Sequence, residues 1–229
     1  MYMYKGKIKK QLSQVFTFAM SGMLVAMLSF SVLEPTVSQA VTSIFSVRQQ
    51  VTAEISFTLS AANVAMTGAL GGVTGGNATG SVSVAVLTNS TTGYTMDVSF
   101  QNSPAMKGEV TDSTAIRNYG SSTEPTYLFF GSTSAQFAYT VQASSSSDLD
   151  PSFLSNGSSA CNTGTTMAAN TCWMGASTTN FRIINRGTAA ATTTATTTLL
   201  FKVLIPNNPA IPVSSDFYTA TATLTAVTQ

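Results

Sequence analysis

The chain has 229 residues, of which only 8% are charged and none is histidine. Globular domains usually carry about 25% charged residues, so Ser, Thr, Asn and Gln must supply most of the polar surface. Ten Lys and Arg residues, four of them within the first ten positions, cannot form the basic patch that a nucleic-acid partner requires. The absence of histidine excludes Ser–His–Asp and Cys–His catalysis and the usual metal-centred mechanisms.

Residues 1–40 have the layout of a secretory signal peptide. Four lysines precede an apolar run at residues 15–33, a proline follows that run, and small residues stand at Ser38 and Ala40. This order predicts cleavage between Ala40 and Val41, so that the protein meets a membrane only before cleavage. A retained transmembrane anchor is the alternative, because an apolar run of this length can just span a bilayer.

The segment 41–60 alternates between apolar and polar residues over almost its whole length. Its odd positions are mostly apolar, and its even positions are polar except for Ile44. A period of two predicts a β-strand with one apolar and one polar face. We call four apolar residues near the start of this segment the assembly residues; they are Val41, Phe45, Val47 and Val51.

A single strand over 41–60 would be longer than its own domain. Such a strand extends roughly 66 Å, whereas a domain of about 190 residues has a diameter of roughly 40 Å. The chain therefore either bends at residues 48–50 to give two strands, or places residues 41–50 in the sheet of another molecule. On the second interpretation residues 41–53 are an extension that donates a strand, and residues 54–229 form the domain.

A glycine-rich stretch and a predicted hairpin come next. Residues 61–80 hold six glycines, which predicts an exposed loop. Residues 81–88 and 94–100 both alternate, and the segment between them is rich in turn-forming residues. The two alternating runs are therefore predicted to pair as a hairpin.

Later segments continue the strand pattern, and helical periodicity occurs only in the leader. The further predicted strands are residues 126–132, 135–142, 180–185, 197–205 and 216–228. Roughly eight or nine short strands without helices predict an all-β fold, an antiparallel β-sandwich behind the signal-peptide helix. A closed barrel is the alternative that the pattern leaves open.

The two cysteines lie close together, with ten residues between Cys161 and Cys172. In an exported protein an isolated pair predicts one disulfide, which contributes roughly 2 to 3 kcal/mol by loop closure. A metal site is the alternative, but two cysteines without histidine are a poor ligand set. We expect no cofactor, and we expect Trp173 to fill the core beside the bridge.

Little in the sequence supports catalysis. Asp148 and Asp150 are the one close pair of carboxylates, and they stand on a serine-rich segment. Paired carboxylates can act as acid and base, but at this spacing on a loop they are more often solvated turn residues or a weak calcium site. We therefore expect that the protein is not an enzyme.

Three segments resemble secreted β-sandwich surface proteins of bacteria and archaea, in particular pilin-like and biofilm-filament subunits. They are the alternating segment after the leader, the Val-x-Thr-Asn-x-x-x-Gly-Tyr motif at 86–94, and the closing strand with Tyr218, Thr223, Thr225, Ala226 and Val227. The resemblance implies an Ig- or pilin-like sandwich whose subunits polymerise by donating an N-terminal strand. Chaperone–usher pilins usually join early strands by their disulfide; the late cysteine pair implies a simpler, secretion-coupled assembly.

Two functions of different classes follow as expectations. The first is a structural subunit of an extracellular filament or cell-surface assembly, in which the assembly residues insert into another copy of the chain. The second is a monomeric secreted or wall-associated adhesion module that binds a glycan or a cell-surface protein; loop aromatics for this role are Tyr119, Tyr127 and Trp173. The first requires residues 41–50 to leave their own domain, and the second requires them to fold back on it.

Overall fold

A computed structural model of the chain describes residues 22–23, 46–111, 114–120, 123–129, 132–168 and 170–229. The chain divides into two compact units, Met1–Gln50 and Val51–Gln229. In the first unit, residues 22–23 are helical and residues 46–50 have no regular structure. None of the described residues belongs to a helix that is both long and apolar enough to cross a membrane. The rest of the predicted signal-peptide helix and the cleavage site at Ala40 and Val41 lie outside the described residues.

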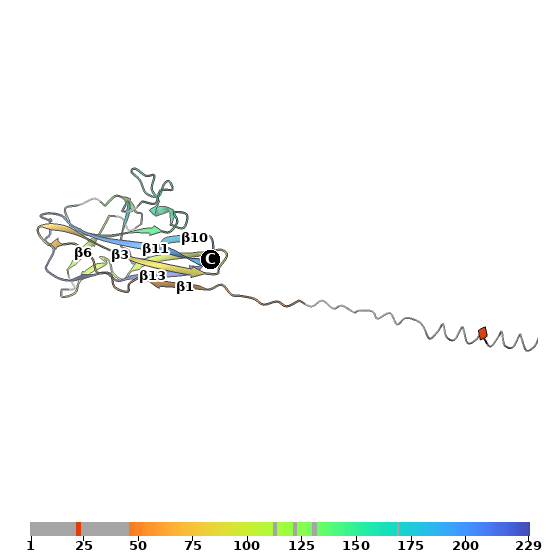
Figure 1. The fold of residues 1–229 in the computed structure, drawn as a ribbon. Helices are drawn as coiled ribbons and strands as arrows, with labels where there is room; N and C mark the ends of the chain where they lie inside the picture. The colour runs from red at the N-terminus through yellow and green to blue at the C-terminus, as the bar shows by residue number, and fades with distance from the viewer. Residues whose placement is uncertain (1–21, 24–45, 112–113, 121–122, 130–131, 169) are drawn as a thin grey trace, which may run out of the picture. The chain divides into compact units, whose positions relative to one another are not determined.

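The second unit is all-β, as predicted (Figure 1). A 3-10 turn, η1 (Pro151–Phe153), is its one helical element among the described residues. Its strands are β1 (Ile55–Leu59), β2 (Leu70–Gly71), β3 (Gly75–Thr88), β4 (Tyr94–Phe100), β5 (Met106–Gly108), β6 (Ala115–Asn118), β7 (Thr126–Tyr127), β8 (Gln136–Ala143), β9 (Cys172–Gly175), β10 (Phe181–Arg186), β11 (Ala190–Ile205), β12 (Tyr218–Thr219) and β13 (Ala222–Thr228).

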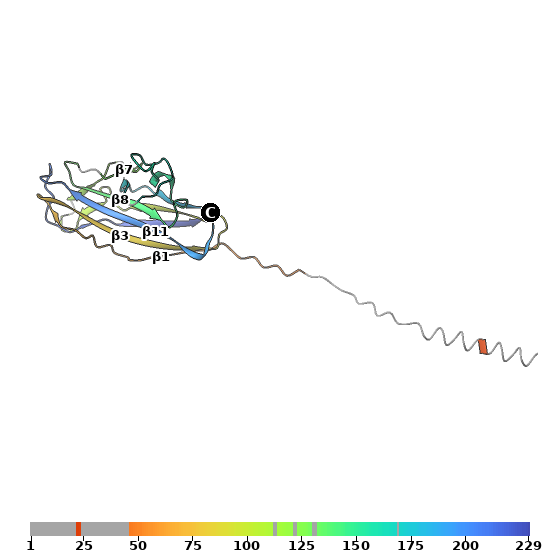
Figure 2. The ribbon, with the colours of Figure 1, turned by 45° about the horizontal axis from the view of Figure 1, so that its top comes forward.

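The strands form a large sheet and a small one. The large sheet has the order β1-β3-β11-β8-β6-β5-β12, with β2 beside β3 and with β9, which carries β7, beside β8. Figure 2 shows β3, β11 and β8 side by side at its centre. β6 runs parallel to β8, so the sheet is mixed and the prediction of an entirely antiparallel fold is wrong at this pair. The small sheet has the order β10-β4-β13 and is antiparallel.

The two sheets share one apolar core. Alternate side chains of β3 and β4 supply much of it, and fully burying each large side chain stabilises the fold by about 1.5 to 3 kcal/mol. These residues are Val82, Val84 and Val86 on β3, and Tyr94, Met96, Val98 and Phe100 on β4. The alternation that predicted these two strands therefore also identified their buried faces.

The predicted hairpin between residues 81–88 and 94–100 is wrong. β3 lies in the large sheet and β4 in the small one, so the turn between them crosses from sheet to sheet. The C-terminal residue holds this turn: the N–H of Gln229 donates to the Gly93 carbonyl at 3.1 Å, and the Ser90 hydroxyl donates to the Gln229 carbonyl at 3.0 Å. A hairpin and a sheet-to-sheet crossing both need a turn between alternating runs, so local sequence does not distinguish them.

The glycine-rich stretch is partly a strand, contrary to the prediction of a loop. β2 pairs with the first residues of β3, and Gly75, Gly76 and Gly80 all lie within β3. A side chain on Gly76 would collide with the carbonyl oxygen of Ala69, and one on Gly80 would come within 2.7 Å of Val64. Glycine in a strand permits such a close approach of another segment.

The other predicted strands differ mainly in length. β8 and β10 match their predicted ranges closely, whereas among the described residues of the predicted strand at 126–132 only the two residues of β7 are in a strand. The run at 216–228 is divided into β12 and β13, and β11 starts seven residues before the predicted position at 197. The short strands β5, β6 and β9 carry no alternation long enough to predict them.

Candidate functional site

The described residues just before β1 do not form a strand. Of residues 46–60, only Ile55–Leu59 pair in a sheet, and residues 46–54 have no regular structure, so within the single chain the predicted strand does not extend over 46–54. Of the assembly residues, Val47 is 86% exposed and Val51 is 79% exposed. Val41 and Phe45 lie outside the described residues. An alternating segment forms a strand only where a neighbouring strand supplies hydrogen-bond partners for its backbone N–H and C=O groups.

Three hydrogen bonds hold residues 52–54 to the end of β3. The Asn89 side chain accepts from the Glu54 N–H at 2.6 Å and donates to the Thr52 carbonyl at 3.0 Å. The Thr88 hydroxyl donates to the Glu54 carbonyl at 2.7 Å. We call this arrangement the Asn89 clamp. It anchors residues 52–54 beside the 89–93 turn, close to the C-terminus marked in Figure 1.

No local feature of the sequence singles out Asn89 for this role. An asparagine before Ser and Thr is a common turn residue, and its amide can bond to many backbone groups. Its partners Thr52 and Glu54 lie more than thirty positions earlier in the chain. Only the antiparallel pairing of β1 with β3 brings them together.

β1 leaves apolar side chains half covered. Phe57 pairs with Val86, and Leu59 pairs with Val84, so all four side chains lie on the core-facing side of the large sheet. The two valines are fully buried, whereas Phe57 is 41% exposed and Leu59 is 43% exposed. β1 is the outermost strand of its sheet, so no further strand lies beyond it to help cover these side chains.

β13, one of the two outer strands of the small sheet, also carries incompletely buried apolar side chains, and it lies against β1. Leu224 pairs with the buried Val98, and Ala226 pairs with the buried Met96, yet Leu224 and Ala226 are only half buried. Together with Phe57 and Leu59 of β1, they form an incompletely covered apolar margin of the core. We call these four residues the open edge.

The predicted disulfide is present. Cys161 and Cys172 are bonded, with Cα atoms 5.8 Å apart, and Cys172 begins β9. A disulfide of this kind indicates an oxidising compartment. Trp173 follows directly and is buried beside Tyr119 and Phe129 in a second, smaller apolar cluster.

The carboxylate pair has separate structural roles. Asp148 is buried and forms an ion pair with Arg186. The Asp150 carboxylate accepts from the Ser152 N–H at 3.0 Å and caps η1. Within the described part of the chain, no cluster of His, Cys, Asp and Glu residues could hold a metal ion. The weak calcium site considered for this loop therefore has no ligand cluster around these two residues.

Two of the three aromatic residues considered for glycan binding are inaccessible. Tyr119 is 6% exposed and Trp173 is 2% exposed, and only Tyr127 is half buried. The Tyr119 hydroxyl donates to the Leu128 carbonyl at 3.0 Å, and the indole N–H of Trp173 donates to the Asn170 carbonyl at 3.0 Å. These two rings have no free face on which a sugar could stack.

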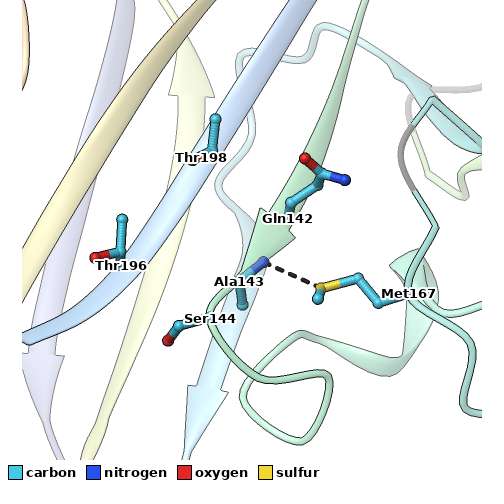
Figure 3. Close-up of a pocket in the computed structure, with 6 residues that line it drawn as sticks. All are labelled: Gln142, Ala143, Ser144, Met167, Thr196 and Thr198. Carbon is cyan, nitrogen blue, oxygen red and sulfur yellow. Dashed lines mark hydrogen bonds between the residues drawn. The ribbon is translucent and has the colours of Figure 1, made fainter.

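A shallow depression of about 250 Å³ lies over the C-terminal end of β8 and the middle of β11 (Figure 3). Gln142, Ser144, Thr196 and Thr198 supply amide and hydroxyl groups to its lining, and Ala143 and Met167 complete it. The Ala143 N–H donates to the Met167 sulfur at 3.2 Å, which holds the methionine against the end of β8. The lining contains no charged residue, so the depression suits at most a neutral polar ligand.

Comparison with known proteins gives no relative: no protein-family description matches the chain, and no curated protein or solved structure is significantly similar to it.

Proposed function

We propose that this protein is a structural subunit of an extracellular filament or cell-surface assembly and that it polymerises by donating its N-terminal segment to a second copy. One observation carries the proposal. Residues 46–54 continue the alternation of β1 but form no strand with their own domain, and they expose Val47 and Val51 almost completely. Exposed apolar side chains with strand spacing are what addition to another sheet requires.

The setting that we propose is extracellular. The signal-peptide layout of residues 1–40 and the Cys161–Cys172 disulfide both support export to an oxidising compartment. The two sheets around one core support a β-sandwich of the Ig or pilin type. We propose no enzymatic activity, since the one close carboxylate pair is committed to an ion pair and a cap.

The expected contact is strong enough to last. Burying the four assembly residues contributes roughly 6 to 12 kcal/mol before the cost of ordering the segment. Each copy gives a segment to one neighbour and receives one from another, so the contact is head-to-tail. A head-to-tail contact that does not close into a ring grows a fibre.

Deletion of residues 41–50 tests the proposal. The deleted protein should be secreted and folded but monomeric by light scattering, and electron microscopy should show no filaments. Val47→Asp with Val51→Asp should have the same effect because charge opposes burial. The matched control is Ser46→Asp with Gln50→Asp, which adds the same charge on the polar face and should still polymerise. Filaments formed by the deleted protein would disprove strand donation.

The alternative is a monomeric adhesion module. The polar depression lined by Gln142, Ser144, Thr196 and Thr198 favours it, because uncharged hydroxyl and amide groups suit a neutral glycan. Burial of Tyr119 and Trp173 weakens it. Wild-type protein that stays monomeric at high concentration and binds immobilised glycans, with loss of binding in Gln142→Ala, would favour this function over filament formation.

A further inference from the structure

The direction of the strands indicates which edge of the domain receives the donated segment; this step rests on the proposed function. β1 runs away from the Asn89 clamp, since Ile55 pairs with Thr88 and Leu59 with Val84. β13 runs toward the clamp, since its first residue pairs with Phe100 and its last with Tyr94, directly after the 89–93 turn. β1 and β13 are therefore oppositely directed.

Head-to-tail copies share one orientation along the polymer, which fixes the direction of the donor. The clamp holds Thr52, so in the proposed polymer the donated segment that precedes Thr52 would meet the end of the next copy that lies opposite that copy's own clamp. In that copy the donor therefore runs in the same direction as β1 and in the opposite direction to β13. Pairing with β13 would be antiparallel, whereas pairing with β1 would be parallel and somewhat less stable per residue.

β10, the other outer strand of the small sheet, also runs opposite to the donor, but its free edge is already covered. The Asp150 N–H donates to the Ile183 carbonyl at 3.0 Å, and the Asn185 N–H donates to the Asp148 carbonyl at 2.8 Å. Residues 148–150 thus pair along β10 as a short extra strand would. β13 is the last strand on its side of the small sheet, and no other described strand pairs with its outer edge.

The apolar surface beside β13 matches the donor's apolar face. The open edge consists of half-covered residues on β1 and β13, so a strand added next to β13 would cover Phe57 and Leu59 from the side. Val47 and Val51 are four positions apart and share one face of an extended segment. Ser46, Arg48 and Gln50 lie on the opposite face and would then face solvent together with Thr223 and Thr225 of β13, whereas Gln49 shares the face of the two valines.

We propose that the outer edge of β13 is the acceptor and that residues 46–51 of a second copy add to it as an antiparallel fourth strand of the small sheet. Val47 and Val51 of the donor then pack over the open edge of the receiving copy. The Asn89 clamp of the donor copy fixes where its segment starts, and therefore which end of the neighbour it meets.

Paired cysteine substitutions in the full chain test this assignment. Ser46→Cys is combined with Thr225→Cys on the outward face of β13, or with Thr58→Cys on the outward face of β1 as the matched control. All three positions are exposed, and the native cysteines are bonded to each other. Facing strand residues lie close enough for a disulfide. Thr223→Cys and Val227→Cys extend the test to neighbouring registers.

We expect a reducible ladder of multimers from Ser46→Cys with one of the β13 positions, and none from Ser46→Cys with Thr58→Cys or from Ser46→Cys alone. A ladder through Thr58→Cys would overturn the choice of β13. If polymers need residues 41–50 but cross-link at no β13 position, the acceptor assignment fails while the proposed function stands. A cross-link within one monomer, or protein that never polymerises, would overturn both.

Discussion

At the scale of single residues, two arginine–aspartate ion pairs are expected to differ in their effect on stability. Arg186 and Asp148 have side chains only 18% and 10% exposed, whereas Arg182 and Asp97 are 41% and 25% exposed. Replacing Arg186 by Met leaves the Asp148 carboxylate buried without its partner. An exposed pair loses little because water solvates the remaining charge.

We therefore predict that Arg186→Met lowers the free energy of unfolding by about 3 kcal/mol, and that the control Arg182→Met lowers it by less than about 1 kcal/mol. Urea unfolding followed by tryptophan fluorescence measures both values. Asp148→Asn with Arg186→Met should recover part of the loss. Equal effects of the two arginine substitutions would contradict this account.

A second residue-scale prediction concerns Asp216. Burial by itself would raise the pKa of this carboxyl group, but hydrogen bonds from the N–H groups of Thr111 and Val110 outweigh it and lower the pKa below the usual 3.8. Because the pKa is lowered in the folded state, the ionised group stabilises the fold above about pH 3.8, and this contribution is lost as the pH falls through the folded-state pKa.

Asp216→Asn should therefore unfold at a slightly lower temperature than the wild type at pH 7, and the difference should shrink below about pH 3.8. Thermal unfolding of both proteins between pH 2 and pH 7 measures this. A difference that stays constant over the whole range would show that the contacts of Asp216 do not depend on its charge.

At the scale of elements, the disulfide closes the loop that precedes β9. The loop is short, so its closure restricts the unfolded chain only moderately. Cys161→Ser with Cys172→Ser should lower the free energy of unfolding by roughly 2 to 3 kcal/mol without abolishing the fold, because the two-sheet core is built by other strands. Differential scanning calorimetry of the oxidised wild type and the double variant measures the loss. Thiol labelling of both cysteines in denatured, unreduced protein would contradict the bridge.

Strands that alternate between apolar and polar residues could be predicted from the sequence. Features that depend on which other strand lies alongside could not. Residues 94–100 match β4 because every second side chain enters the core and the polar ones do not. Residues 46–54 show the same pattern but have no neighbouring strand to pair with. The turn at 89–93 has suitable residues for a hairpin, yet the chain crosses there to the other sheet. Periodicity reports which face is apolar, but not which strand lies alongside.

At the scale of the whole molecule, signal-peptide cleavage determines whether residues 41–51 form the free N-terminal end of the secreted protein. We predict that the secreted protein begins at Val41, because Ser38 and Ala40 have the spacing of a cleavage site. Intact-mass measurement of secreted protein tests this directly. A mass that includes residues 15–33 would contradict cleavage and favour a membrane anchor.

The sequence by itself determined the all-β class, the bonded cysteine pair and the buried faces of the main strands, because alternation, redox chemistry and the lack of helical periodicity are local properties. Tertiary structure alone decided the parallel pair β6 and β8, the crossing between sheets and the Asn89 clamp. It also left Phe57 and Leu59 half covered and the outer edge of β13 unpaired. Each of these features depends on contacts between segments that are distant in the sequence. The order of the strands in the sheets decides which segments meet, and the residue pattern of a single strand does not contain that order.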